Sequence, residues 1–308
     1  MTSNRPAIPS SPTSREPLAP DGIAGVVLDA KDLANTRAFY EPIFAHARGR
    51  WDSGRRSLAF SASCGQRIEF VQRSKPRTIA HAGLHVAYRV PANHLTRLVG
   101  ELEAAGHPAS WWREDHPSER LPMPFLTDPS GNIVQLIGSD NDRALIDHYY
   151  APVDDIDSAE LFYLEALKGT LDSYFGYRTE DVAAAREWLS GDDVCAPWTR
   201  NKFVSFRTHA PNPTPAAQIF ARYGDGYVGT CLSGQRLPEP PEEQLRGTPR
   251  VVLHTPRAPA DVEAYLASVR ISTVALTYDG GKVPFEREGS QFFTRDRSGN
   301  FVQIDCTG

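Results

Sequence analysis

The sequence predicts an α+β protein made of four βαβββ units, and internal repetition carries this prediction. Two segments, Asp128–Leu136 and Asp296–Ile304, share the pattern D-x-S-G-N-x-V-Q and lie 168 positions apart. Asp and Ser can bond nearby backbone groups, and Gly and Asn tolerate a positive φ, so each segment begins as a tight turn. The alternating residues that follow predict a strand.

A second repeated pattern marks the start of each half. Val26–Tyr40 aligns with Tyr149–Tyr163 at an offset of 123 positions. Both segments contain a short strand, an Asp followed by an aliphatic residue, and a helix that carries Phe-Tyr. The Asp stands where an N-cap is expected, just before the helical periodicity begins.

Each half divides once more. Leu84–Val90 alternates as a strand does and is followed by a helix over His94–Ala105, which Gly106 ends. The counterpart is the strand Arg250–Thr255, with a helix from about Asp261 to Val269. Four modules of the form strand, helix, three strands are therefore expected, starting near residues 22, 82, 146 and 248.

The chain of 308 residues is longer than one core usually serves, so two domains are expected, at 22–140 and 145–308. Residues 1–21 are rich in Pro and Ser and predict a flexible arm. The second half is longer, which indicates an insertion around 168–205 with a helix at 179–189. A lid, a homodimer contact and a surface decoration all remain open for this insertion.

Composition narrows the class of protein. With 40% hydrophobic and 23% charged residues the chain can form real cores, and its net charge of −5 gives no electrostatic reason to bind nucleic acid or an anionic membrane. It has no run of 18 apolar residues, no signal-peptide pattern at its start, and four cysteines without C-x-x-C spacing. We therefore expect a cytoplasmic protein with reduced thiols and a small-molecule ligand.

The repeated turns and the strand–Asp–helix starts together resemble the vicinal-oxygen-chelate superfamily of glyoxalases, extradiol dioxygenases and bleomycin-resistance proteins. The resemblance covers about residues 22–138 and 145–306. It implies two vicinal-oxygen-chelate domains, each with a curled mixed sheet that forms a cup. It also implies a divalent metal (Fe, Mn, Zn or Ni) on the cup floor, held by the first and last strands of the modules and able to chelate two neighbouring substrate oxygens.

In the first half, the positions that the resemblance singles out are Gly25, Glu69, His85 and Gln135. Glycine offers no side-chain ligand, so Glu69, His85 and Gln135 are the predicted metal ligands. A neutral amide is a poorer ligand for a hard cation than a carboxylate. The alternative is therefore a metal-free cup in which His85 hydrogen-bonds Glu69 or Gln135.

In the second half, the corresponding positions are His148, a residue near Thr230, Arg250 and Gln303. Arginine is always charged and would repel a metal, but its planar guanidinium suits an anionic oxygen of a ligand. We predict His148, Arg250 and His254 as catalytic residues. A salt bridge from Arg250 to Asp305, and a displaced metal site made of His148, His254 and Asp305, remain open.

The resemblance implies a glyoxalase- or dioxygenase-like enzyme (dioxygenase, lyase or isomerase) that acts on a small oxygenated or aromatic molecule, with a degenerate metal site. The alternative is a metal-free binding or resistance protein of the same fold. A purely structural protein would fit only if side chains filled both cups. Trp111 and Trp112 precede a polar loop, 113–120, which either borders the first cup or is anchored by a buried ring.

Overall fold

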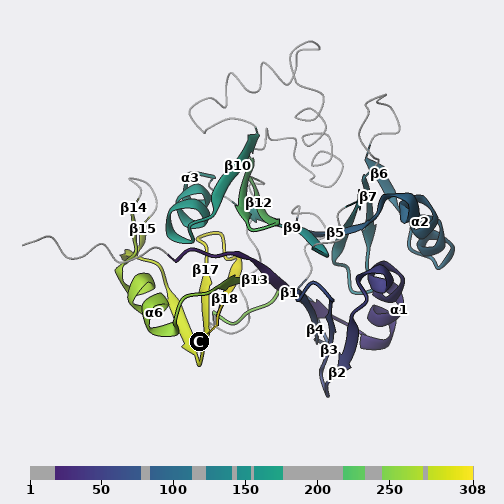
Figure 1. The fold of residues 1–308 in the computed structure, drawn as a ribbon, viewed down its shortest axis with the longest axis horizontal. Helices are drawn as coiled ribbons and strands as arrows, with labels where there is room; N and C mark the ends of the chain where they lie inside the picture. Colours follow the sequence, from purple (N-terminus) through teal and green to yellow (C-terminus); the bar gives the residue numbers. More distant parts are fainter. Residues whose placement is uncertain are drawn as a thin grey trace, which may run out of the picture.

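The computed structural model describes residues 18–77, 84–112, 123–140, 144–153, 156–175, 218–232, 245–272 and 277–307. It confirms the α+β class: the described residues form two eight-stranded mixed sheets, with a few helices packed against them (Figure 1). The predicted helix at 179–189, the loop 113–120 and the first seventeen residues of the arm lie outside the described residues.

The first sheet, called sheet A, has the strand order β16 (Phe285–Glu288), β17 (Gln291–Arg295), β18 (Phe301–Cys306), β13 (Arg250–Thr255), β1 (Gly22–Ala30), β4 (Arg67–Gln72), β3 (Ser57–Ser61), β2 (Arg50–Ser53). Sheet B has the order β10 (Thr170–Phe175), β11 (Gln218–Tyr223), β12 (Gly226–Leu232), β9 (Ile146–Val153), β5 (His85–Pro91), β8 (Ile133–Ser139), β7 (Met123–Thr127), β6 (Ser110–Trp112). The other elements are α1 (Leu33–Phe44), α2 (Leu95–Ala104), α3 (Ile156–Glu160), which continues as a π-helical stretch over Leu161–Ala166, α6 (Pro259–Ser268), and a small ribbon of β14 (Arg270–Ser272) and β15 (Thr277–Lys282).

The four modules pair into two sheets, but not in chain order. Sheet A joins the first module to the fourth through the antiparallel pair β1–β13, and sheet B joins the second to the third through β5–β9. Each sheet therefore contains strands from both sides of the domain boundary expected between residues 140 and 145. The expectation that residues 22–140 and 145–308 each build their own cup is corrected by this pairing.

The helices keep each half of the chain together. Helices α1 and α2 lie side by side (Figure 1). Tyr265 of α6 donates a hydrogen bond of 2.9 Å to the carbonyl oxygen of Ala166, at the end of the α3 segment. In the first half Tyr40 donates to the Asp128 carboxylate over 3.0 Å, and in the second half Tyr163 donates to Asp296 over 3.1 Å. The two repeated sequence patterns are therefore bonded to each other.

Local predictions about the helices hold. The Asp32 carboxylate accepts a hydrogen bond from the backbone N–H of Asn35 (2.7 Å) and so caps α1, as expected of an N-cap. Helix α2 ends before Gly106, whose φ of +92° suits glycine. Strand β5 alternates as predicted, since Val86 and Tyr88 lie in the core while His85 and Ala87 face away from it.

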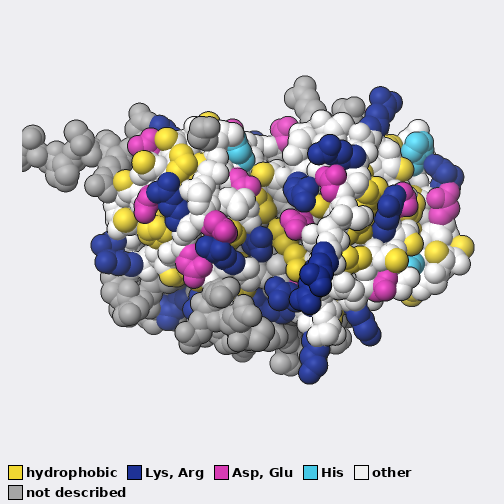
Figure 2. Space-filling view, turned by 90° about the horizontal axis from the view of Figure 1, so that it is seen from below, with side chains coloured by type: hydrophobic (Ala, Val, Ile, Leu, Met, Phe, Trp, Pro, Cys, Tyr) yellow, Lys and Arg dark blue, Asp and Glu magenta, His cyan; other side chains and the backbone are white. Residues whose placement is uncertain are grey.

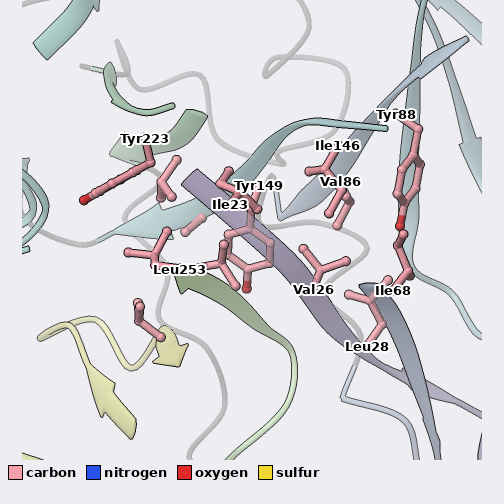
Figure 3. Packing of buried hydrophobic residues seen from close by; sticks show 14 of the residues in the cluster. Ile23, Val26, Leu28, Ile68, Val86, Tyr88, Ile146, Tyr149, Tyr223 and Leu253 are labelled. Carbon is pink, nitrogen blue, oxygen red and sulfur yellow. The ribbon is translucent and has the colours of Figure 1, made fainter. Parts of the chain in front are cut away.

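One apolar core runs between the sheets and the helices. Figure 3 shows residues from both sheets meeting there, with Val26 and Leu28 of β1 near Val86 of β5 and Ile146 of β9. Figure 2 shows charged side chains of both signs interspersed over one face of the molecule. Within the described part of the chain, no helix has the length and hydropathy needed to cross a membrane.

Candidate functional site

Sheet B brings two buried histidines into contact. His85 lies on β5 and His148 on the neighbouring strand β9, and their Nε2 atoms are 3.1 Å apart. Their exposed fractions are only 6% and 7%. The two imidazoles come from different halves of the chain but share sheet B, so the prediction that they lie in separate cups is wrong.

A β-bulge in β9 adds a carboxylate to this pair. Ala87 pairs with His148 and Tyr88 pairs with Ile146, so Asp147 is an extra residue with no partner position on β5. Neighbouring residues of a regular strand point to opposite faces, but a bulge breaks this alternation. Asp147 consequently lies on the same side as His148, with Oδ2 2.7 Å from Nδ1 of the imidazole.

Arg89 holds the other oxygen of Asp147. Its Nε donates to Oδ1 over 2.8 Å, and its Nη2 donates to the carbonyl oxygen of Asp225 over 2.7 Å. Burial alone would raise the pKa of Asp147, but the hydrogen bond and charge of His148 and the charge of Arg89 outweigh burial and lower the pKa to about 2. The Asp147 carboxylate can only accept a hydrogen bond, so it favours the tautomer of His148 with the proton on Nδ1, in which the lone pair lies on Nε2.

Aromatic rings surround the two imidazoles. The Tyr150 ring stacks on His85 (centroids 4.7 Å apart, 13° between planes), Phe125 meets His85 edge-on at 5.4 Å, and Phe220 meets His148 edge-on at 5.8 Å. Such rings limit the access of water, and electrostatic interactions are stronger in a dry site.

Gln135 stands in the same row of the sheet. Ala87 pairs with both His148 and Gln135, so the three residues share a face of sheet B, and Gln135 is 4% exposed. Its amide oxygen is a ligand type that a divalent metal accepts. We name His148, Gly229, His85 and Gln135 the floor of sheet B, because they occupy the first and last strands of its two modules.

The spacing of the histidines fits a shared metal. With metal–nitrogen distances of about 2.0–2.1 Å, two ligands of one ion lie about 2.9 Å apart at a right angle and about 3.4 Å apart in a tetrahedron. The observed 3.1 Å falls between these values, and it also suits an N–H···N hydrogen bond. Among the described residues, no three His, Cys, Asp or Glu side chains form a group that could hold a metal ion, so Gln135 is the third candidate ligand.

Glu69 does not belong to this site. Its strand β4 pairs with β1 in sheet A, so the predicted ligand set of Glu69, His85 and Gln135 is divided between two sheets. The position that matches Glu69 in sheet B is Gly229, because Tyr150 pairs with Gly229 as Val27 pairs with Glu69. The position near Thr230 was therefore misplaced by one residue.

Arg250 takes the place of His85 in sheet A. Its Nε donates to Gln303 over 2.7 Å, and its Nη1 donates to the carbonyl oxygens of Arg246 (3.3 Å) and Gly247 (3.2 Å). Its guanidinium also lies 5.5 Å from the centroid of the Phe293 ring. Burial lowers the pKa of Arg250. The described hydrogen bonds of Arg250 thus all go to neutral acceptors.

The other predicted second-half residues are likewise divided between the sheets. His254 lies in sheet A with its Nδ1 2.6 Å from Oδ1 of Asp21, and Asp305 accepts from Gln303 over 2.7 Å. His148 is in sheet B. The proposed catalytic group of His148, Arg250 and His254, and the displaced site of His148, His254 and Asp305, are therefore not assembled, because their strands belong to different sheets.

Sequence reasoning missed Asp147, Arg89 and Tyr150 as neighbours of the histidines. A signal for the first of these was present: the alignment at offset 123 sets Asp147-His148 against Ala24-Gly25. A charged pair in place of two small residues indicates a specialised site in one copy of the repeat. The bulge that turns Asp147 toward His148 has no comparable signal in the sequence.

No protein-family model and no curated protein matches the chain. Among solved structures, glyoxalase I from Zea mays matches with a TM-score of 0.59 and 13% identity, over 92% of both chains. A putative dioxygenase from Bacillus subtilis matches with a TM-score of 0.55 and 13% identity, over 93% of this chain and 85% of that one. Likeness at this level of identity shows the fold, so the chain shares the overall fold of these two proteins.

Proposed function

We propose that the protein is an enzyme that acts on a small oxygenated or aromatic molecule at the floor of sheet B, with a divalent metal held between His85 and His148. The observation that carries the proposal is the 3.1 Å approach of their Nε2 atoms in a buried, ring-lined part of the sheet. The two solved neighbours, a glyoxalase and a putative dioxygenase, support an enzyme of this general kind.

The residues of the floor and their neighbours have different roles in this proposal. His85 and His148 supply imidazole lone pairs, Gln135 supplies an amide oxygen, and Asp147 orients His148. The rings of Phe125 and Phe220 limit water and offer flat apolar surface beside the histidines. A divalent ion, when bound, supplies Lewis-acid polarisation of a substrate oxygen.

The charge of this ligand set affects how tightly a metal is held. Two neutral imidazoles and a neutral amide leave both positive charges of the ion uncompensated, whereas a carboxylate in place of Gln135 would neutralise one of them. We therefore expect weaker metal retention than from two histidines and a carboxylate. The remaining positive charge favours a substrate that brings its own anionic oxygen.

A metal-free enzyme or binding protein is the second candidate, and the same contact favours it. Without a metal, His85 can donate its Nε2–H to the Nε2 lone pair of His148 over the observed 3.1 Å. Asp147, His148 and His85 then form a chain that can accept or pass a proton. Metal content separates the two candidates.

The test is elemental analysis of untagged protein purified without chelators and then supplied with Fe, Mn, Zn or Ni. We expect wild-type protein to retain one of these metals, and His85→Ala and His148→Ala to lose it. His254→Ala, a histidine of sheet A, is the matched control and should retain it, as should Glu69→Ala. A correctly folded wild-type protein that retains no supplied metal would overturn the metal-dependent form and leave the metal-free candidate.

A further inference from the structure

We infer that Asp147, held in place by Arg89, is a positioning residue that fixes the tautomer of His148 so that the Nε2 lone pair faces His85. The inference rests on the proposed function for its purpose. Its structural content, the tautomer of His148, can be tested without any metal.

The bulge in β9 brings the Asp147 carboxylate to the side of the sheet on which His148 lies. A regular register would place Asp147 on the face opposite to His148. Because Asp147 has no partner position on β5, its carboxylate instead reaches the Nδ1 atom of the next residue at 2.7 Å. Adjacent residues of one strand thus form the contact, and the backbone itself keeps them in register.

Arg89 restricts the carboxylate to this orientation. Its Nε donates to the Asp147 oxygen that does not contact His148, and its Nη2 donates to the carbonyl oxygen of Asp225 in the turn between β11 and β12. Arg89 is 9% exposed, and its Nη1 is buried without a hydrogen-bond partner among the described residues. Burying a charged guanidinium with one nitrogen unbonded costs free energy, so Arg89 depends on its bonds to Asp147 and Asp225 and has little freedom to release the carboxylate.

The repeat provides an internal comparison. In sheet A the bulge of β1 falls at the equivalent place, between Ile23 and Gly25, and the residues there are Ala24 and Gly25. Sheet A therefore has the same backbone irregularity with neither imidazole nor carboxylate. The bulge in sheet A forms without an Asp, so the fold does not require Asp147. We therefore relate Asp147 to the neighbouring His148 and not to the formation of the bulge.

The consequence is a fixed direction for the lone pair. A neutral imidazole carries its proton on one nitrogen and its lone pair on the other. With the proton held on Nδ1 by Asp147, Nε2 is free to accept a hydrogen bond or a metal. With the proton on Nε2, that atom could do neither. Outer partners of this kind typically change metal affinity by about 10- to 100-fold when they are removed.

The experiment is ¹⁵N-detected imidazole NMR of the metal-free protein, comparing wild type with Asp147→Asn. An Asn can donate to Nδ1, and this reverses the tautomer. We expect His148 to change from the Nδ1–H to the Nε2–H form, with about 10- to 100-fold weaker metal retention. Asp21→Asn beside His254 is the matched control: it alters an equally close Asp–His contact in sheet A and should leave metal retention unchanged.

The outcomes separate this inference from the proposed function. If wild type binds no metal but Asp147→Asn still changes the tautomer, the positioning inference stands and the metal proposal fails. If the tautomer of His148 is the same in both proteins, the inference is overturned whatever the metal content. Should Asp147→Asn fail to fold, Asp147→Glu and Arg89→Gln take its place. Asp147→Glu should keep His148 in the Nδ1–H form, and Arg89→Gln should yield a mixture of the two tautomers. An unchanged tautomer in Arg89→Gln would overturn the role assigned to Arg89.

Discussion

The two sheets use one scaffold in opposite ways. At matched floor positions, sheet A has Gly25, Glu69, Arg250 and Gln303, and sheet B has His148, Gly229, His85 and Gln135. In sheet A the charged groups are bonded to the protein's own polar groups, as the contacts of Arg250 show. In sheet B two imidazole nitrogens face each other. A duplicated framework can therefore keep its strands while its two copies carry different polar groups at matched positions.

In each sheet, one of the four floor positions is a glycine. A side-chain carbon at Gly25 would lie 2.0 Å from the backbone oxygen of Arg67, so the close approach of β1 and β4 requires glycine there. A side-chain carbon at Gly229 would lie 2.4 Å from the ring of Tyr150. Backbone packing thus requires the glycine at the first floor position of sheet A, and the ring that stacks on His85 requires the glycine at the second floor position of sheet B.

The largest expected effect comes from filling the glycine position of sheet A. Gly25→Ala should lower the free energy of unfolding by about 3 kcal/mol or more, because the clash is with backbone and cannot be relieved by a rotamer change. Urea denaturation measures it. Gly22→Ala, at the start of the same strand with no atom within 4 Å of the added carbon, is the control and should stay near wild type. Equal stability of the two variants would contradict the packing argument.

A smaller effect is expected at the position that His85 and Arg250 share. Arg250→Ala removes three hydrogen bonds and a contact with Phe293, so it should lower the free energy of unfolding by about 1–3 kcal/mol without changing metal content. Denaturation and elemental analysis of one preparation measure both. Unchanged stability together with weaker binding of inorganic phosphate would instead support the sequence-based expectation that Arg250 binds an anionic ligand.

The smallest effects test whether the two halves are equivalent. Tyr40→Phe and Tyr163→Phe each remove one buried hydrogen bond to the Asp of the repeated turn, so each should cost about 1–2 kcal/mol of stability. The double variant should show the sum, because the two bonds lie in different halves. A cost at only one of the two sites, measured by urea denaturation, would show that the repeat is not symmetric in energy.

The stability that Tyr40 and Tyr163 contribute should also depend on alkaline pH. Burial, as the largest cause, raises the pKa of both Tyr40 and Tyr163 above 10. A raised pKa means that folding favours the protonated form, so the stability from each tyrosine is complete below about pH 10 and falls by about 1.4 kcal/mol per pH unit above it. The stability gap between wild type and either Phe variant should therefore narrow as the pH rises above 10. A gap that stays constant to pH 11 would contradict this assignment.

The sequence was sufficient to predict the modules but not their partners. The repeated turns and helix starts located all four modules, and Asp32 and Gly106 behave as predicted. The first strands of all four modules alternate in the same way, and nothing in that alternation says which two will pair. Glu69 was therefore placed beside His85 although its strand lies in the other sheet. Asp147 was missed because a bulge depends on the partner strand, which the sequence does not identify.

The pairing of modules also sets an order of assembly. All eight strands of sheet B lie between residues 85 and 232, while sheet A needs β1 to β4 at one end of the chain and β13 with β16 to β18 at the other. A chain made from its N-terminus releases every strand of sheet B before β13 exists, and the pairing of Gly22 with His254 then closes a loop that spans most of the chain. The face that carries the two histidines can thus form during synthesis. The edge of β1 that pairs with β13 stays unpaired until the last module has been synthesised.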